Sequence, residues 1–434
     1  MNEIKHYQQR RARLIASMHQ GVAIIPTAPE SVRSRDSHYP YRFDSYFYYL
    51  TGFAEPEAML VLIAGDAPKT ILFCRDKNIE REIWEGYRYG PEVAREAFGL
   101  DAAYSINSLD EMMPKLLADQ PALFYAMGAE PVWDARVVGW LNKVREQSRS
   151  GVSAPQEIRD VRVLLDEMRL IKGAEELAVM RRAAEISTGA HRRAMQKTQP
   201  GKHEYEIEAE LLHDFRRFGA QSPAYTSIVA GGANACVLHY IENNAPLQDG
   251  DLLLIDAGCE MDGYAADITR TFPVNGKFSA AQKDIYEMVL TAQAAAIAVA
   301  KPGDTWDAPH EAALRVLAAG MIDFGLVQGS VDAVLESGDY KRFYMHRTGH
   351  WLGLDVHDVG DYKRDGQWRT LQPGMTLTVE PGCYIRPADD VPQAFWNIGV
   401  RIEDDVLLTE TGNEVLTHAA PKTVQEIEDV MRHD

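Results

Sequence analysis

The segment DLLLIDAGCEMDGYAADITRTFPV, residues 251–274, constrains the fold more than any other part of the sequence. It contains two strand-like runs separated by Asp262 and Gly263, a dipeptide that favours a tight turn between antiparallel strands. A turn at these residues sets the register of the pair, so that Met261 faces Tyr264. Because the run LLLI is apolar, the segment predicts a β-hairpin whose first strand is buried.

This register brings two aspartates together. Asp256 ends the first strand and faces Thr269, and Asp267 lies diagonal to Asp256 on the same face of the hairpin. Two carboxylates at this spacing repel each other unless a cation or a shared proton lies between them. The alternative is a solvent-exposed face with two hydrated aspartates, although the adjacent apolar run argues against exposure. The hairpin therefore indicates a candidate cation site.

Other strand-like segments carry side chains that can bind metals. In FYMHRTGHWLGLDVHDVG, His346 and His350 are four residues apart and share one face of a strand, which the aromatic residues and glycines favour, or of a helix. A single histidine in such a segment is more often a hydrogen-bonded core residue. Glu380 ends another apolar run, and Glu403 lies in a further one, where alone it would be an ordinary hydrated glutamate.

Together these segments offer one imidazole and four carboxylates, a set rich in hard oxygen ligands. Two divalent cations would neutralise the four negative charges, and a bridging hydroxide would complete the site of a two-metal hydrolase. Such ligands suit Mn²⁺ better than Cu(I), which prefers thiolates. The sequence therefore predicts two divalent metal ions, with Mn²⁺ as the expected metal.

The balance of charges excludes some classes of partner. The chain has 64 acidic and 45 basic residues, so its net charge of −19 repels phosphate backbones and anionic membrane surfaces. It contains no apolar stretch of the roughly 18 residues that span a bilayer, and its N-terminus lacks the features of a secretory signal. The four cysteines have no CxxC spacing, which indicates reduced thiols. We expect a cytoplasmic protein that binds neither nucleic acid nor membranes.

Two domains are expected from the pattern along the chain. A helical N-terminus followed by strand-like runs predicts a smaller α/β domain, and separate strand and helix stretches later predict an α+β domain. The expected helices are 156–172, 174–196, 279–300 and 306–325, and the expected strands of the first domain are 21–26, 58–65 and 69–75. The predicted division is an N-terminal domain with a linker helix, residues 1–172, and a catalytic domain, residues 173–434.

The order of the candidate ligands is Asp256, Asp267, His350, Glu380 and Glu403. This order resembles that of the pita-bread metallopeptidases, which include methionine aminopeptidase, prolidase and aminopeptidase P. The segments DSHYPYRFDSYFYYLTGFAEPEAMLVL (36–62) and HRTGHWLGLDVHDVG (346–360) are most similar to the aminopeptidase P (Xaa-Pro aminopeptidase) family. The resemblance implies a pita-bread catalytic domain after an N-terminal domain of the creatinase/aminopeptidase P type. It also implies a proline-specific aminopeptidase that assembles as a homo-oligomer, a dimer or tetramer.

The resemblance further implies how the ligands divide between two metal ions. Asp256 would chelate one ion, and His350 and Glu380 would bind the other. Asp267 and Glu403 would bridge both ions. Glu380 would also hydrogen-bond the bridging hydroxide and act as the general base of peptide hydrolysis.

Substrate contacts are implied for other residues. His239 and His357 resemble the histidines that contact the substrate near the scissile bond, and His346 resembles the residue that lines the proline-side pocket. Arg401 and Tyr384 resemble residues that contact the metal ligands and the substrate-binding side chains and hold them in place.

Several alternatives stay open. A prolidase has the same ligands but cleaves only dipeptides. A binding protein on the same fold, or a creatinase-like hydrolase of C–N bonds, would need no metal, although the presence of all five ligand types argues against both. Arg347 departs from the related motifs, in which a small residue is common, and its large cation can alter the proline-side pocket. Trp84 is interpreted as a core or subunit-interface residue.

Overall fold

The computed structural model describes residues 4–432, and the chain forms two compact units, Met1–Arg169 and Leu170–Asp434. Each unit has its own hydrophobic core. Among the described residues, no helix is both long and apolar enough to cross a membrane. The four cysteines are free and buried, as the spacing predicted.

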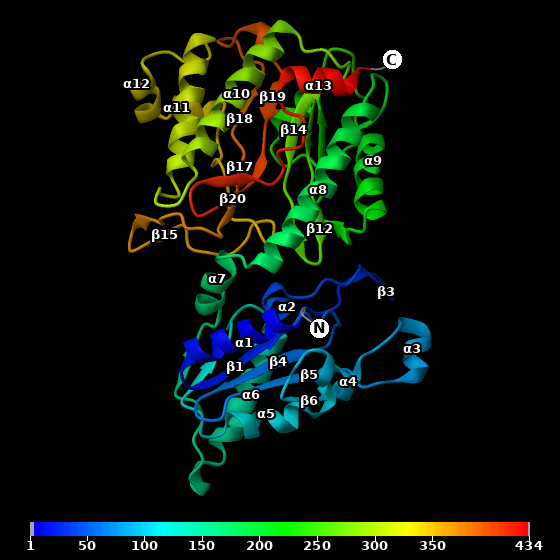
Figure 1. Ribbon diagram of the computed structural model, residues 1–434, viewed down its shortest axis with the longest axis vertical. Coiled ribbons are helices and arrows are strands. Elements are labelled where there is room, and N and C mark those ends of the chain that lie inside the picture. The colour runs from blue at the N-terminus through cyan, green and yellow to red at the C-terminus, as the bar shows by residue number, and fades with distance from the viewer. Residues whose placement is uncertain (1–3, 433–434) are drawn as a thin grey trace. The chain divides into compact units, whose positions relative to one another are not determined.

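The first unit is a mixed six-stranded sheet with helices packed against it (Figure 1). Its elements are α1 (Lys5–Met18), β1 (Gly21–Pro26), β2 (Val32–Ser34), β3 (Ser37–His38), α2 (Ser45–Thr51), β4 (Met59–Ala64), β5 (Lys69–Cys74), α3 (Ile79–Glu85), α4 (Gly90–Ala97), β6 (Ala102–Ser105), α5 (Leu109–Leu117), β7 (Ala122–Phe124), α6 (Pro131–Arg145), β8 (Glu157–Arg159) and α7 (Arg162–Leu170). The strand order is β6-β5-β4-β1-β7-β8.

The central strand β1 is covered on both faces. Val22 and Ile24 point to one side and join a core with α5 and α6, whereas Ala23 and Ile25 point to the other side and are also buried. Strand β4 runs antiparallel to β1 and to β5, and the remaining neighbours are parallel. The predicted α/β character of the first domain is confirmed.

The prediction of a single helix over 156–172 is wrong at its start. Residues Glu157–Arg159 form the edge strand β8, which pairs in parallel with β7, and α7 begins only at Arg162. All three strand residues are exposed. Their place in the sheet depends on backbone hydrogen bonds to β7, which a helical pattern of side chains cannot report.

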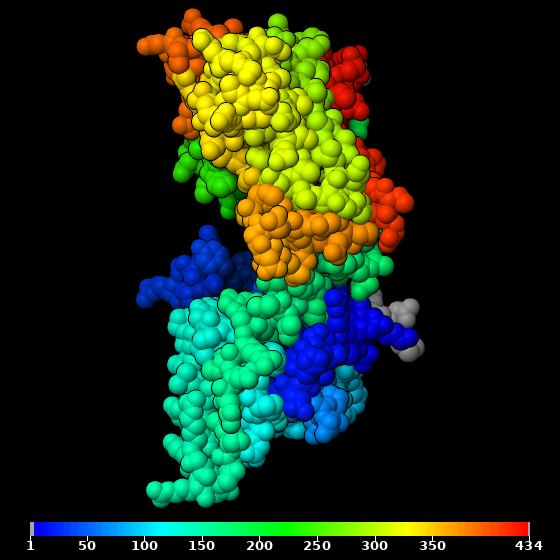
Figure 2. Space-filling view, turned by 90° about the vertical axis from the view of Figure 1, so that its left-hand side faces the viewer, coloured from blue at the N-terminus to red at the C-terminus, as the bar shows by residue number. Residues whose placement is uncertain are grey.

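The second unit consists of small antiparallel sheets surrounded by helices. Its elements are α8 (Ala174–Lys197), α9 (Glu204–Arg217), β9 (Ser222–Pro223), β10 (Ile228–Gly231), β11 (Leu252–Asp256), β12 (Cys259–Met261), β13 (Tyr264–Ala265), β14 (Thr269–Pro273), α10 (Ala280–Val299), α11 (Ala308–Asp323), α12 (Val331–Ser337), β15 (Lys363–Arg364), β16 (Gln367–Trp368), β17 (Thr376–Val379), β18 (Gly382–Ile385), β19 (Ile398–Arg401), β20 (Asp404–Leu408), β21 (Asn413–Val415) and α13 (Val424–Met431). Figure 2 shows α10, α11 and α12, coloured yellow-green to yellow, on one outer face of this unit.

The long helices of this unit follow the sequence pattern closely. Helix α8 begins and ends within one residue of the predicted helix 174–196, and α10 lies inside the predicted 279–300. Ser279 starts α10, because its hydroxyl accepts a hydrogen bond from the backbone N–H of Gln282. The apolar side of these helices packs into the core around the sheets.

The predicted hairpin is present in the predicted register. Met261 pairs with Tyr264, and Asp256 pairs with Thr269. Its two halves belong to different sheets, with β11 and β14 in one and β12 and β13 in the other. Gly258 lies where the hairpin changes sheets, and a Cβ atom on it would be 1.7 Å from the carbonyl oxygen of Ala266. The crossing therefore requires glycine at this position.

The strand predicted around His346 and His350 is not formed. This segment is irregular, although it runs beside β17 and makes backbone hydrogen bonds from Glu380 to Thr348 and from Thr378 to His350. A Cβ atom at Gly349 would lie 2.0 Å from the Thr378 carbonyl oxygen, so the two backbones approach closely there. The close approach and the glycines bend the segment away from regular strand geometry.

Candidate metal centre

One cavity of about 440 Å³ in the second unit gathers the candidate ligands. It is lined by the five predicted ligands and by all three predicted substrate histidines: Asp256, Asp267, His350, Glu380, Glu403, His239, His346 and His357. Arg401 also lines this cavity. Tyr384 does not; it is buried behind the cavity wall.

The ligand side chains come from the ends of strands. Asp256 is the last residue of β11, Asp267 lies two residues before β14, Glu380 directly follows β17, and Glu403 directly precedes β20. His350 comes from the irregular segment beside β17. The sheets thus hold the backbones rigidly, while the strand ends leave these polar side chains free to point into one space.

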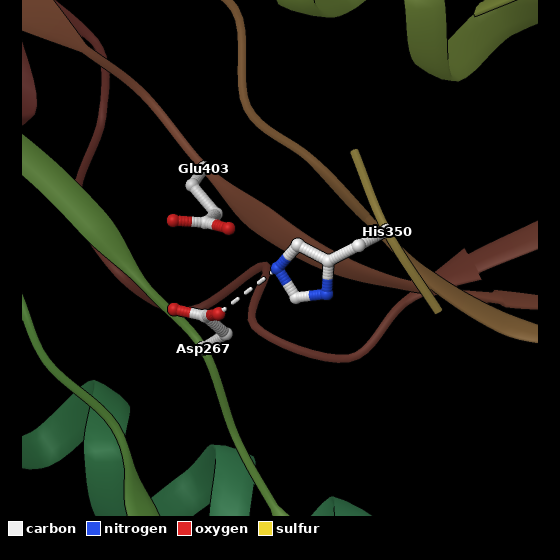
Figure 3. Close-up of side chains that lie close together, drawn as sticks. All are labelled: Asp267, His350 and Glu403. Carbon is white, nitrogen blue, oxygen red and sulfur yellow. Dashed lines mark ion pairs between the residues drawn. The ribbon is translucent and has the colours of Figure 1, made fainter. Parts of the chain in front are cut away.

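Three of these residues form a compact group. Asp267, His350 and Glu403 each offer a ligand atom, and these atoms lie within 4.8 Å of one another. Figure 3 shows the three side chains pointing toward a common centre. The Nε2 atom of His350 lies 3.3 Å from an Asp267 carboxylate oxygen and 3.8 Å from a Glu380 oxygen. The group can therefore supply three ligand atoms to one cation, or four together with Glu380.

The orientation of His350 leaves its Nε2 atom available as a ligand. The Nδ1 atom lies 2.9 Å from the carbonyl oxygen of Trp351. A carbonyl oxygen only accepts, so Nδ1 must carry the proton and donate. With a metal ion bound, the neutral ring would present the lone pair of Nε2 to that ion, which is the arrangement that metal-binding histidines adopt.

Burial and neighbouring charges shift the pKa values of the ionisable groups in this cluster. Burial raises the pKa of Glu380 to about 7, and burial together with Asp267 raises the pKa of Glu403 well above its ordinary value. Burial and the nearby Asp256 also raise the pKa of Asp267. Burial alone would lower the pKa of His350, but its contacts with Asp267 and Glu380 raise it to about 9.

This donor set fits hard divalent cations. Burial and the neighbouring carboxylates raise the pKa of Asp267 and Glu403, so these groups hold their negative charge best beside a compensating cation. Carboxylate oxygens and one imidazole are ligands that Mn²⁺ and Zn²⁺ accept. The chemistry of such a site is the activation of water and of a carbonyl group.

A tyrosine that the sequence analysis missed links the two hairpin aspartates. The Tyr225 hydroxyl lies 2.6 Å from an Asp256 oxygen and makes a second, shorter hydrogen bond to Asp267. The hydroxyl of Thr269 similarly donates to Glu403, at 2.6 Å. Tyr225 has no spacing that connects it with the ligands. The hairpin register placed Thr269 opposite Asp256, but only the folded chain reveals its contact with Glu403.

Arg401 and Tyr384 link the ligands to the substrate side. Arg401 donates to an Asp256 oxygen at 2.7 Å and to the Tyr384 hydroxyl at 3.0 Å. That hydroxyl in turn lies 2.8 Å from Nε2 of His346. Burial and the charge of Arg401 lower the pKa of His346 to about 4, which keeps this imidazole neutral. His239 and His357 are more exposed and face the cavity without these restraints.

Comparison with known proteins gives matches over nearly the whole chain. The description "Metallopeptidase family M24" matches residues 178–410, and "Aminopeptidase P, N-terminal domain" matches residues 7–125. The Xaa-Pro aminopeptidase of Escherichia coli is 46% identical over 436 residues, which cover 99% of each chain.

Solved structures agree with these matches. The aminopeptidase PepP of Pseudomonas aeruginosa matches with a TM-score of 0.97 and 51% identity, over 98% of this chain and 97% of that one. A zinc-substituted aminopeptidase P of E. coli in complex with product matches with a TM-score of 0.97 and 46% identity, over 99% of this chain and 98% of that one. The two-part fold implied by the sequence, with a pita-bread second unit, is confirmed.

Proposed function

Because the chain belongs to metallopeptidase family M24 and is an aminopeptidase for Xaa-Pro peptides, we propose that two divalent cations in the cavity drive its hydrolysis. The observation that carries this proposal is the convergence of four carboxylates and one imidazole on one cavity. A single divalent ion would leave two of the four negative charges uncompensated, whereas two ions balance them.

The geometry supports a specific division of the ligands. Asp267 and Glu403 are proposed to hold both ions, since they form the compact group with His350. His350 and Glu380 would complete one site, and Asp256 would complete the other. The Tyr225 hydroxyl lies within hydrogen-bond distance of both Asp256 and Asp267 and can donate its one proton to either carboxylate. All five ligands belong to the second unit of the chain, Leu170–Asp434.

When bound, the two ions would polarise the scissile carbonyl and lower the pKa of water toward about 7, which provides hydroxide near neutral pH. Glu380 is proposed as the general base, because its buried carboxylate lines the cavity beside the other ligands, where it can take a proton from water. His239 and His357 are proposed to contact the substrate at the scissile bond. His346, held by Tyr384, would line the proline side.

The preference for proline has a physical basis. An Xaa-Pro bond has no N–H group, so an extended substrate loses one of the backbone donors that ordinary peptidases use. A rigid pocket that packs against the proline ring can compensate for the hydrogen bond that the missing N–H would have made. His346 and Arg401 support such a wall, and His346 keeps its neutral form across the physiological pH range.

Further features of the function are proposals from the sequence and the fold. We propose Mn²⁺ as the metal, since the donors are mainly carboxylate oxygens. A homo-oligomer, dimer or tetramer, is supported by α3, on which Ile79, Ile83 and Trp84 are exposed by 76%, 78% and 86%. The division at residues 172 and 173 and the cytoplasmic location stay predictions. Sedimentation of the purified protein would test assembly.

The test of this function compares three substrates and two metal states. We expect Mn²⁺-loaded protein to release alanine from Ala-Pro-Ala far faster than from Ala-Ala-Ala or from the dipeptide Ala-Pro, and chelation to abolish this activity. Turnover confined to Ala-Pro would favour a prolidase instead. Binding of peptides without turnover in any metal state would favour a metal-free binding protein.

A matched pair of variants tests the proposed base. Glu380→Ala should lose activity, whereas Glu336→Ala, which changes an exposed glutamate on α12, should retain it. Full activity of Glu380→Ala with both metals bound would remove Glu380 from the mechanism.

A further inference from the structure

Arg347 lies at the edge of the catalytic cavity, beside His346. It lines the cavity, and its side chain is 46% exposed. Arg401 is the other arginine among the residues that line this cavity. Arg401 is buried and already serves Asp256 and Tyr384, so Arg347 is the arginine there that incoming solutes can reach.

Two elements hold the Arg347 guanidinium in place. Asp307, at the start of α11, forms an ion pair with one of its terminal nitrogens. The guanidinium carbon also lies 5.0 Å from the centre of the Trp368 ring, on the hairpin of β15 and β16. Stacking on an aromatic face and pairing with a carboxylate both suit the planar guanidinium. Arg347 is therefore positioned although it is exposed.

Asp307 forms this ion pair although it stands at a helix N-terminus, where aspartate usually caps the helix. Asp307 occupies the N-cap of α11, yet its side chain makes no capping hydrogen bond to that helix. Aspartate is among the preferred N-cap residues because it normally accepts from the first turn. Here its carboxylate turns to Arg347 instead. Helix α11 thus has no side-chain cap from Asp307, and Asp307 orients the Arg347 guanidinium at the cavity instead.

The charge around Arg347 favours an anionic group. Lys363 lies 4.0 Å from the centre of the same Trp368 ring, so two cations lie beside this indole, and Asp307 pairs with Arg347. A guanidinium with free N–H groups at the cavity edge matches the geometry of a carboxylate.

We propose that Arg347 binds a carboxylate carried by the residue that follows the proline of the substrate. This inference rests on the proposed function, and it names the substrates that the site prefers: short peptides ending at that residue, or peptides with an acidic side chain there. Arg347 is then a specificity-determining residue rather than a catalytic one.

The experiment measures kcat/KM of the Mn²⁺-loaded full chain on matched substrates. Ala-Pro-Ala is compared with its C-terminal amide, and Ala-Pro-Asp amide is compared with Ala-Pro-Asn amide. We expect wild-type protein to prefer the carboxylate member of one pair about tenfold, the size of a partly hydrated charge-assisted contact. A preference in the first pair identifies the chain terminus as the ligand, and one in the second identifies the acidic side chain.

Variants then assign the preference to Arg347. In Arg347→Gln the ratio should fall to about one, and in Arg347→Lys it should fall to an intermediate value, because an ammonium attracts a carboxylate but cannot bind it in a bidentate way. The control Arg315→Gln removes another exposed arginine that pairs with an aspartate, Asp332, and should leave the ratio unchanged.

The outcomes separate this inference from the proposed function. Absence of turnover on every proline peptide would contradict the proposed function. Normal turnover with no preference in either pair, or an unchanged ratio in Arg347→Gln, would overturn the role of Arg347. If Arg347→Gln does not fold, Arg347→Lys decides: a lowered ratio supports the role and an unchanged ratio overturns it.

Discussion

Arg270 ties the metal-binding region to the C-terminal segment, and its loss should be costly. The side chain is fully buried on β14 and donates to the backbone oxygens of Thr269 and Glu403. It also donates to two carbonyls of the C-terminal segment and forms a 2.7 Å ion pair with Asp404, whose side chain is completely buried. One of its acceptors is thus the backbone of a proposed metal ligand.

The change Arg270→Met removes this cation while keeping most of the side-chain volume. Burial alone would raise the pKa of Asp404, but Arg270 and Lys422 hold it below its ordinary value, so the carboxylate remains charged. Removing one partner of a buried ion pair typically costs about 3–5 kcal/mol. Lys422 still pairs with Asp404 at 2.6 Å in this variant, but several carbonyls lose their donor, so we expect a loss of about 3–4 kcal/mol.

The assay is urea unfolding followed by tryptophan fluorescence, with a double-mutant cycle. Arg270→Met combined with Asp404→Leu should cost much less than the sum of the single changes, since neither buried charge then faces an absent partner. Arg181→Met is the control, because its 2.7 Å pair with Glu414 is exposed and should contribute less than about 1 kcal/mol. A loss below about 1 kcal/mol for Arg270→Met, or strict additivity in the cycle, would show that the buried pair contributes little to stability.

Three further predictions use other sites. Gly258→Ala should abolish folding or metal binding, because its Cβ would lie 1.7 Å from a carbonyl oxygen, whereas Gly189→Ala, which meets nothing within 4 Å inside α8, should be neutral or stabilising; circular dichroism and metal analysis distinguish the two. Burial lowers the pKa of His191 in the folded chain to about 4, whereas the ordinary pKa of histidine is 6.5. Between these values the unfolded chain binds a proton that the folded chain does not, so the free energy of unfolding should fall by about 3 kcal/mol as the pH drops from 6.5 to 4. Unfolding titrations of His191→Gln should show a flatter pH dependence. His350→Ala should lower both metal content and turnover, whereas His357→Ala should retain metal while kcat and kcat/KM fall together; metal loss in His357→Ala would reverse the two assignments.

The features that the sequence predicted well depend on local patterns. The register of the hairpin follows from one Asp-Gly turn, and it correctly placed Asp256 opposite Thr269. Helices α8 and α10 follow from apolar periodicity over many residues. Carboxylates in or beside apolar runs drew attention to the candidate ligands, and the family resemblance singled out His350 among the neighbouring histidines. The structure brings all five to one cavity.

The features that the sequence did not predict depend on distant partners. The irregular path around His350 results from its close approach to β17 at Gly349, and no local pattern encodes that neighbour. Strand β8 exists because β7 offers free backbone groups beside it. Tyr225 is an ordinary tyrosine in the sequence, and only the fold brings its hydroxyl between Asp256 and Asp267.

Metal analysis shows whether the five ligands hold two metal ions with Asp267 and Glu403 shared between them. Protein incubated with Mn²⁺ and then dialysed would be analysed by mass spectrometry for metal bound per chain. We predict two ions in the wild type, and a larger loss in Asp267→Ala and Glu403→Ala than in Asp256→Ala, because a shared ligand serves both ions. A single ion in the wild type would exclude the two-metal site, and equal losses in all three variants would exclude shared ligation by Asp267 and Glu403.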